Sequence, residues 1–315
     1  MATNTKIELV EAMWNPLAGC EPSLSIPLKK KKPTMWFVNS MSDLFHEDVP
    51  FEFIDKVFAV MALCPQHTFL VLTKRAERLA EYFSAHDVGL RWALAVHELQ
   101  QTKKGWPDPE TALDWDHNGL PNVWLGVSVE NQKRADERIP HLLKCPAAVR
   151  FLSSEPLLGS VDLRKHVPGW RRCNGCGKNL QIPKTGHPKC DCGGQRRSRL
   201  SGFGGYGISP VDYLDWVIVG GESGPQARPC HIDWIRSIIK QCRDADVPCF
   251  VKQLGSKPYK IHRVARDSPG IPAGEVAERV SELKLKHPKG GDPEEWPEGL
   301  KIREMPRGAA GTATN

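Results

Sequence analysis

Four cysteines lie close together in the chain and have the spacing of a metal site. Two residues separate Cys173 from Cys176, one residue separates Cys190 from Cys192, and thirteen residues lie between the two pairs. Zinc prefers tetrahedral thiolate ligands, and the glycines beside each pair allow two sulfurs to point at one ion. The single spacer of the second pair is a weaker match, and His187 is an alternative ligand. We predict a structural zinc site, because four protein ligands leave no open position for a substrate.

The same region carries most of the excess positive charge. The chain has 43 lysines and arginines against 37 acidic residues, and residues 164–200 alone hold ten basic residues and one acid. Such clustering predicts contact with an anionic partner, above all nucleic acid. The residues that we expect to make this contact are Arg171, Arg172, Arg196, Arg197 and Arg199. The alternative is a basic loop that only keeps the protein soluble.

Short apolar runs alternate with amphipathic stretches along most of the chain. The predicted strands are Met35–Asn39, Thr68–Leu72, Asn122–Val129, Val149–Leu152, Trp216–Val219 and Pro248–Val251, with a less certain first strand near Lys6–Val10. The predicted helices are Phe51–Cys64, Glu77–Ser84, Asn131–Lys144 and His231–Ala245. This alternation is typical of βα units around a parallel sheet. We predict an α/β fold: a partial (β/α) barrel of about six or seven units, with a small zinc-ribbon-like insertion.

Polar residues follow nearly every predicted strand. Ser128 and Glu130 follow one strand, and Gly220, Gly221 and Glu222 follow another. In a parallel barrel the carboxyl ends of the strands meet at one rim, where active sites form. The sequence therefore predicts a site on this rim. The alternative is that these residues only form the hydrogen bonds that hold solvated loops together.

The distribution of residue types along the chain also predicts how the chain divides into segments. We expect a first part of the barrel over 1–163, a Cys/Arg-rich insertion over 164–210, the last part of the barrel over 211–255 and an irregular extension over 256–315. No apolar run approaches the roughly 18–20 residues that a membrane helix needs, and no secretory signal is evident. We therefore expect a cytoplasmic protein without a membrane partner. The remaining cysteines of the barrel are expected in or near the core: Cys64, Cys145, Cys230, Cys242 and Cys249.

Seven stretches together resemble the phage gene-product-37/gene-product-68 family, and they span nearly the whole chain. They are MWNPLAGC (13–20), FVNSMSDLFHEDVP (37–50), HTFLVLTKR (67–75), NVWLGVSVENQKRADERIP (122–140), RFLSSEPLLG (150–159), DWVIVGGESGPQARP (215–229) and KGGDPEEWPEGLKIREMP (289–306). The resemblance implies a radical S-adenosylmethionine-like barrel. It also implies a four-iron–four-sulfur cluster on three cysteines after the first strand, and a partner protein from the same gene neighbourhood.

Carried over position by position, the resemblance implies a set of cofactor contacts. Cys20 corresponds to a cluster ligand. Ser40, Ser42 and Asp43 would lie near the amino-acid end of S-adenosylmethionine, and Ser128, Glu130 and Asn131 near its ribose. Gly220, Gly221 and Glu222 would line the adenine or the substrate.

The chain departs from this family where the cluster should be. Residues 21–29, which follow Cys20, already lead toward the second strand, and the other two cluster cysteines are missing. We therefore expect radical chemistry to be absent or impaired. Three hypotheses remain open: a barrel derived from an enzyme that acts on nucleic acid or a macromolecular partner, a non-catalytic zinc-containing protein that binds nucleic acid, and a decayed gene product of marginal stability.

Overall fold

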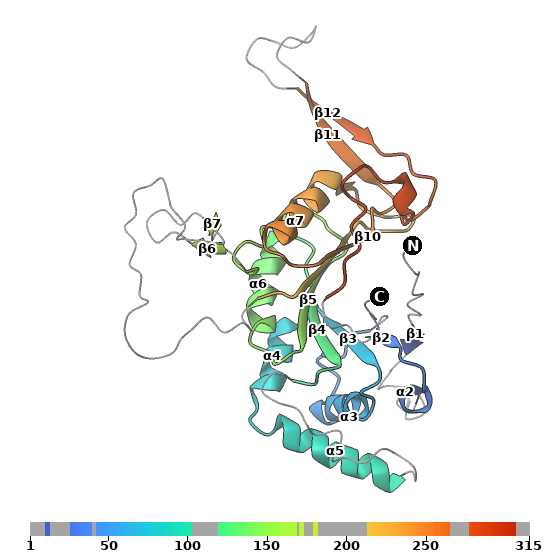
Figure 1. Ribbon diagram of the computed structural model, residues 1–315, viewed down its shortest axis with the longest axis vertical. Coiled ribbons are helices and arrows are strands. Elements are labelled where there is room, and N and C mark those ends of the chain that lie inside the picture. The colour runs from blue at the N-terminus through green and yellow to red at the C-terminus, as the bar shows by residue number, and fades with distance from the viewer. Residues whose placement is uncertain are drawn as a thin grey trace.

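The computed structural model describes residues 10–12, 26–39, 42–102, 119–168, 170–172, 179–181, 213–264 and 277–306. Within these ranges the main feature is a curled parallel sheet that forms a half-barrel (Figure 1). Its strands are β1 (Val10–Ala12), β2 (Met35–Val38), β3 (Thr68–Thr73), β4 (Val123–Ser128), β5 (Val149–Ser154), β8 (Trp216–Gly220) and β10 (Cys249–Gln253). They lie side by side in chain order, and every neighbouring pair is parallel. The predicted partial barrel is confirmed at this level.

Helices cover one face of the sheet. The longer ones are α3 (Phe51–Ala62), α4 (Ala76–Ser84), α5 (Val88–Thr102), α6 (Gln132–Leu142) and α7 (Ile232–Asp244), and α2 (Ile26–Lys29) is a single short turn. A large apolar core lies between these helices and the sheet. A smaller cluster, centred on Trp124, Phe151 and Trp216, contains only residues of the strands and the C-terminal segment. It occupies the face that the helices leave open.

The predicted elements agree closely with the observed ones. All six firmly predicted strands and all four predicted helices are confirmed, with ends that differ by at most two residues. The first strand lies at Val10–Ala12, later than expected. Helix α5 was not predicted, because Leu90 and Leu94 are exposed on it and blur its amphipathic pattern.

The basic insertion leaves the barrel and returns to it at one point. The backbone N–H of Leu214 donates to the carbonyl of His166 at 3.0 Å, so the two ends of the excursion are hydrogen-bonded. Between them, β6 (Trp170–Arg172) and β7 (Asn179–Gln181) form an antiparallel hairpin in which Arg172 is opposite Asn179. Residues 169, 173–178 and 182–212 lie outside the described ranges.

The segment beyond Gly255 is more ordered than the irregular extension that we expected. β11 (Pro258–Val264) pairs with β12 (Ala277–Glu282) and with the short strand β9 (Cys230–His231). After the 3-10 turn η3 (Pro293–Glu295), the chain runs along the free edge of β10. There Val251 donates to Ile302 at 2.8 Å, and Glu304 donates to Cys249 at 2.9 Å. The C-terminal segment thus covers an edge that would otherwise be open.

In the part of the chain that the structure describes, no helix is both long enough and apolar enough to cross a membrane.

Candidate binding site at the carboxyl rim

Charged side chains gather where the parallel strands end. Four carboxylates stand at this rim, one after each of four strands: Asp43, Glu130, Glu155 and Glu222. Each of them contacts a lysine or an arginine. The rim is therefore built from carboxylate–cation pairs, not from isolated charges.

Asp43 joins the loop after β2 to the end of β3. Its carboxylate accepts hydrogen bonds from Thr73 Oγ1 at 2.7 Å, from the Lys74 backbone N–H at 3.0 Å and from Arg75 Nη1 at 3.1 Å. It also accepts one from the backbone N–H of Phe45. Ser42 beside it is exposed.

Glu130 differs from the other rim acids in that it contacts two cations. Arg138, two turns into α6, donates to it at 3.1 Å and also to the carbonyl of Ser128 at 2.7 Å. Lys74 approaches the same carboxylate from β3 at 3.6 Å. Asn131 caps α6 by accepting a hydrogen bond from the Arg134 backbone N–H at 3.1 Å, and Ser128 is buried.

Glu155 and Glu222 complete the rim beyond β5 and β8. Glu155 contacts Lys252 at 3.0 Å and accepts from Gln253 at 2.9 Å. Glu222 accepts from the Nε of Arg228 at 2.7 Å and from its Nη2 at 2.9 Å. These bonds from Arg228 lower the pKa of Glu222 to about 2, so this carboxylate is ionised at neutral pH.

The acidic and basic members of these pairs differ in exposure. The exposed fraction of the side chain is 59% for Lys74 against 14% for Glu130, and 34% for Arg75 against 14% for Asp43. It is 56% for Lys252 against 15% for Glu155, and 57% for Arg228 against 29% for Glu222. In these four pairs the carboxylate is the more shielded member and the cation reaches into solvent. Arg138, the second cation on Glu130, is instead as shielded as its partner, at 13% against 14%. The surface that the rim offers to a partner is therefore cationic.

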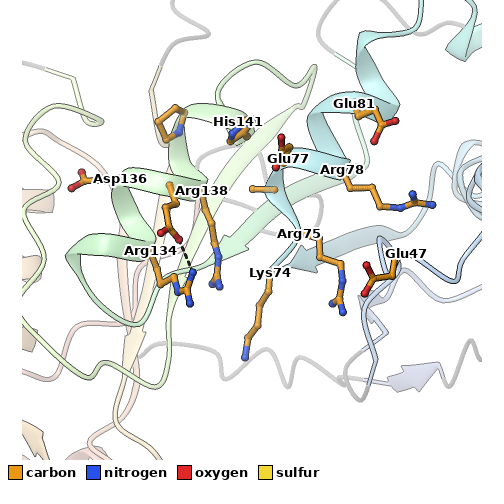
Figure 2. A pocket seen from close by; sticks show the side chains of 13 residues that line it. Glu47, Lys74, Arg75, Glu77, Arg78, Glu81, Arg134, Asp136, Arg138 and His141 are labelled. Atoms are coloured by element: carbon orange, nitrogen blue, oxygen red, sulfur yellow. Dashed lines mark hydrogen bonds and ion pairs between the residues drawn. The ribbon is translucent and has the colours of Figure 1, made fainter.

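A groove of about 840 Å³ between α4 and α6 opens beside this rim. Figure 2 shows Lys74, Arg75 and Arg138 extending to the same side of the groove, with Glu77 and His141 on the other side. Arg134 also lines it and forms an ion pair with Glu137 at 2.6 Å. Because α4 and α6 both begin at the rim, their positive dipole ends add to the basic character of this end of the groove.

Close packing explains why glycines stand at the end of β8, at positions 220 and 221. A Cβ on Gly221 would lie 2.2 Å from the carbonyl oxygen of Leu254, and one on Gly220 would lie 2.9 Å from that of Gln253. The neighbouring end of β10 fills this space. Close contact between two strands accounts for these glycines, and their role in lining the adenine or the substrate stays an implication of the resemblance.

Most of the predicted metal ligands and nucleic-acid contacts lie outside the described residues. This holds for Cys20, Ser40, Cys173, Cys176, Cys190, Cys192, Arg196, Arg197 and Arg199, while Arg171 and Arg172 belong to β6. The five other cysteines are buried, as predicted. Burial raises the pKa of Cys64, Cys145 and Cys230 to about 12, which keeps these thiols protonated. Among the described side chains, no group of three or more His, Cys, Asp or Glu could hold a metal ion.

The structure adds rim residues that the predicted site did not include. The cations Lys74, Arg75, Arg138, Arg228 and Lys252 are as much a part of this rim as the acids. Lys74 and Arg75 directly follow a strand, which is a signal that the sequence contains. Arg138 and Arg228 lie eight and six residues beyond their acidic partners, so only the folded backbone identifies these pairs.

The class of protein follows from these features: it is an α/β half-barrel of parallel strands with a charged rim. The chain belongs to the family described as "Protein of unknown function (DUF5131)", which it matches over residues 21–277. No curated protein and no solved structure matches it.

Proposed function

We propose that this protein binds nucleic acid through the carboxyl rim of its half-barrel. The observation that carries the proposal is the exposure pattern of four of the rim pairs, in each of which the cation is the outer member; the shielded Arg138 is the exception. Lysine and arginine side chains bind the phosphate backbone whatever the base sequence. Each shielded carboxylate holds its cation in place, so less side-chain freedom is lost when a phosphate binds.

The basic insertion supports the same proposal, because it begins beside the groove. Lys165 forms an ion pair with Asp136 of α6, and Asp136 lines the groove between α4 and α6. Gln132, in the first turn of α6, accepts a hydrogen bond from the Asp162 backbone at 2.6 Å. The path into the insertion is thus fixed to α6. In this proposal, the arginines of the insertion extend the surface that begins at the rim.

A zinc site within the insertion is part of the proposal. Cys173 and Cys176 fall in the sequence between β6 and β7, which pair antiparallel, and their two-residue spacing suits the structural zinc of a zinc ribbon. Cys190 and Cys192 would complete the ligand set. We expect about one zinc per chain by elemental analysis, reduced in Cys176→Ser. Purified wild type without zinc would contradict this part of the proposal.

The proposal assigns no radical step to this chain. The resemblance described above implies an iron–sulfur cluster on three thiolates, but Cys20 is the only cysteine before the buried Cys64. The donor set does not fit a cluster. The groups that would hold S-adenosylmethionine are also engaged within the chain: Asn131 caps α6, while Asp43 and Glu222 bind neighbouring cations.

Fluorescence anisotropy with labelled oligonucleotides tests the proposed binding. We expect the association constant to fall as salt rises, with a log–log slope of about −3 to −4, because four rim cations contact phosphates. Lys74→Gln and Lys252→Gln should each weaken binding and reduce the steepness of this slope by about one. Lys240→Gln is the matched control, since Lys240 is an exposed lysine near the far end of α7. Rim variants that bind like the wild type would overturn the proposal.

A further inference from the structure

A two-stranded ribbon projects from the half-barrel next to the rim. β11 and β12 are antiparallel over six registered pairs, and they extend away from the body beside α7 (Figure 1). At about 3.4 Å per residue, six residues span roughly 20 Å. The base of the ribbon is fixed to the rim, because the backbone N–H of Ser256 donates to the carbonyl of Glu222 at 2.8 Å.

The register separates the charges of the ribbon onto two faces. Residues directly opposite each other in an antiparallel pair share a face, and successive residues alternate between faces. Lys260 is opposite Ser281, and His262 is opposite Arg279, so one face holds two permanent cations and a histidine. The other face carries the acids: Glu282 is opposite Tyr259, and Glu278 is opposite Arg263.

The cations of the first face differ from those of the rim. Among the described residues, no carboxylate lies within ion-pair distance of Lys260 or Arg279, whereas each of the four rim carboxylates holds a cation. Arg279 and His262 are exposed, and Lys260 is half-buried. His262 Nε2 lies 2.7 Å from the hydroxyl of Ser281, which helps to hold the imidazole on this face. The face therefore offers positive charge that no carboxylate in the described part of the chain neutralises.

We propose that this basic face of the β11–β12 ribbon enters the major groove of duplex DNA while the rim binds the adjacent phosphates. The inference rests on the proposed function and names its partner. The major groove of B-form DNA, about 12 Å wide and 8.5 Å deep, admits a two-stranded β-ribbon, and Lys and Arg side chains suit its acceptors. The major groove of A-form RNA is too narrow to be read by side chains.

The test compares one 25-base-pair sequence as duplex DNA, as duplex RNA and as a single DNA strand, by anisotropy with the full-length chain at several salt concentrations. We expect the wild type to prefer duplex DNA. The double variant Lys260→Gln/Arg279→Gln should lose at least tenfold in affinity for duplex DNA and reduce the steepness of the salt slope by about two. Its affinity for a single strand, which engages the rim alone, should change less than threefold.

Two control variants separate ribbon contact from net charge and from folding. Lys284→Gln removes one exposed charge that follows β12 outside the ribbon, and Glu282→Gln changes the opposite face. Both should keep duplex binding within twofold of the wild type. All variants should retain the wild-type melting temperature, because the changed side chains are exposed or half-buried.

The other possible results of these measurements distinguish the rim proposal from the ribbon inference. If rim variants weaken binding but the ribbon variant does not, the ribbon inference is overturned and the rim proposal stands. Equal or tighter binding of duplex RNA, or of the single strand, would overturn entry into the major groove. If the wild type binds no nucleic acid at all, both proposals fail, and the basic face is then a surface for an acidic protein.

Discussion

Arg228 and Glu222 meet in a two-point contact at the end of β8, with the guanidinium Nε and Nη2 donating at 2.7 and 2.9 Å to different carboxylate oxygens. The backbone N–H of Arg228 donates to the same carboxylate at 2.8 Å. Such a fork fixes the plane of the guanidinium as well as its position. The remaining donors of Arg228 face solvent, ready for a phosphate oxygen.

Two conservative substitutions in this pair distinguish the effect of its charges on nucleic-acid binding from its effect on the structure of the loop. Arg228→Gln removes the outer cation and should weaken nucleic-acid binding about three- to tenfold. Glu222→Gln removes the competing anion and also frees the guanidinium that Glu222 holds in place. We expect the loss of the anion to have the larger effect, so binding should tighten about twofold, with a steeper salt dependence. Equal weakening by both variants in the anisotropy measurement would show that the pair only braces the loop.

Gly221→Ala should destabilise the protein strongly. The new methyl group would lie 2.2 Å from the Leu254 carbonyl oxygen, so β8 and β10 would have to separate. We expect a loss of about 2–3 kcal/mol in the free energy of unfolding, measured by urea denaturation. Gly159→Ala is the matched control, because its Cβ would meet only the Asn131 side chain, at an ordinary 3.6 Å. A loss below about 0.5 kcal/mol in Gly221→Ala would show that the two strand ends separate easily.

The sheet could be predicted from sequence because its strands are buried on both faces. Such strands appear as continuous apolar runs, as in Thr68–Thr73, where five of the six residues are buried. The periodicity of α7 was equally clear, since Ile232, Ile235, Ile238, Ile239 and Cys242 are all buried. These patterns reflect local burial, which a single sequence records directly.

The pairing of the rim charges could not be predicted in the same way. Lys252 contacts Glu155 from a strand that lies almost a hundred residues further along the chain. The two meet only because β5 and β10 both pair with β8, one on each side of it. The β11–β12 ribbon was missed for another reason. Its charges alternate with only a few apolar residues, and residues 278–280 of β12 are all exposed, so the pattern resembles that of a loop.

A buried hydrogen-bond chain fastens α5 to α3, and we predict that Tyr82→Phe breaks it. The Tyr82 hydroxyl donates to Asp55 at 2.7 Å and accepts from Trp92 Nε1 at 2.7 Å. Burial raises the pKa of Asp55, and the Tyr82 hydroxyl opposes that shift. Removing the hydroxyl takes one hydrogen bond from each of two buried side chains, Asp55 and Trp92, which should cost about 1–3 kcal/mol in the free energy of unfolding.

The control for this loss is a second tyrosine. Tyr259 stacks on His231 with ring centroids 5.0 Å apart, and its hydroxyl has no hydrogen-bond partner among the described residues. Tyr259→Phe should therefore change stability by less than about 0.5 kcal/mol in the same denaturation experiment. If the two variants lose the same stability, the buried chain does not hold α5 in place.

His166 makes the stability of the fold depend on pH. The residue lies where the basic insertion leaves the barrel, and its Nε2 is buried with no hydrogen-bond partner among the residues that the structure describes. Burial, with a smaller effect from the neighbouring Lys165, lowers the pKa of His166 from 6.5 to about 4. The folded state therefore keeps this imidazole neutral over a range in which the unfolded chain protonates it.

Because the pKa is lower in the folded state, the stabilising contribution is complete above pH 6.5 and is lost as the pH falls toward 4. A shift of this size corresponds to a loss on the order of 3 kcal/mol across that interval. Urea denaturation at half-unit steps from pH 7 to pH 4 measures it. His166→Phe and His166→Gln cannot be protonated, so each should unfold with a shallower pH dependence than the wild type. A wild-type dependence that survives in both variants would assign the acid sensitivity to other groups.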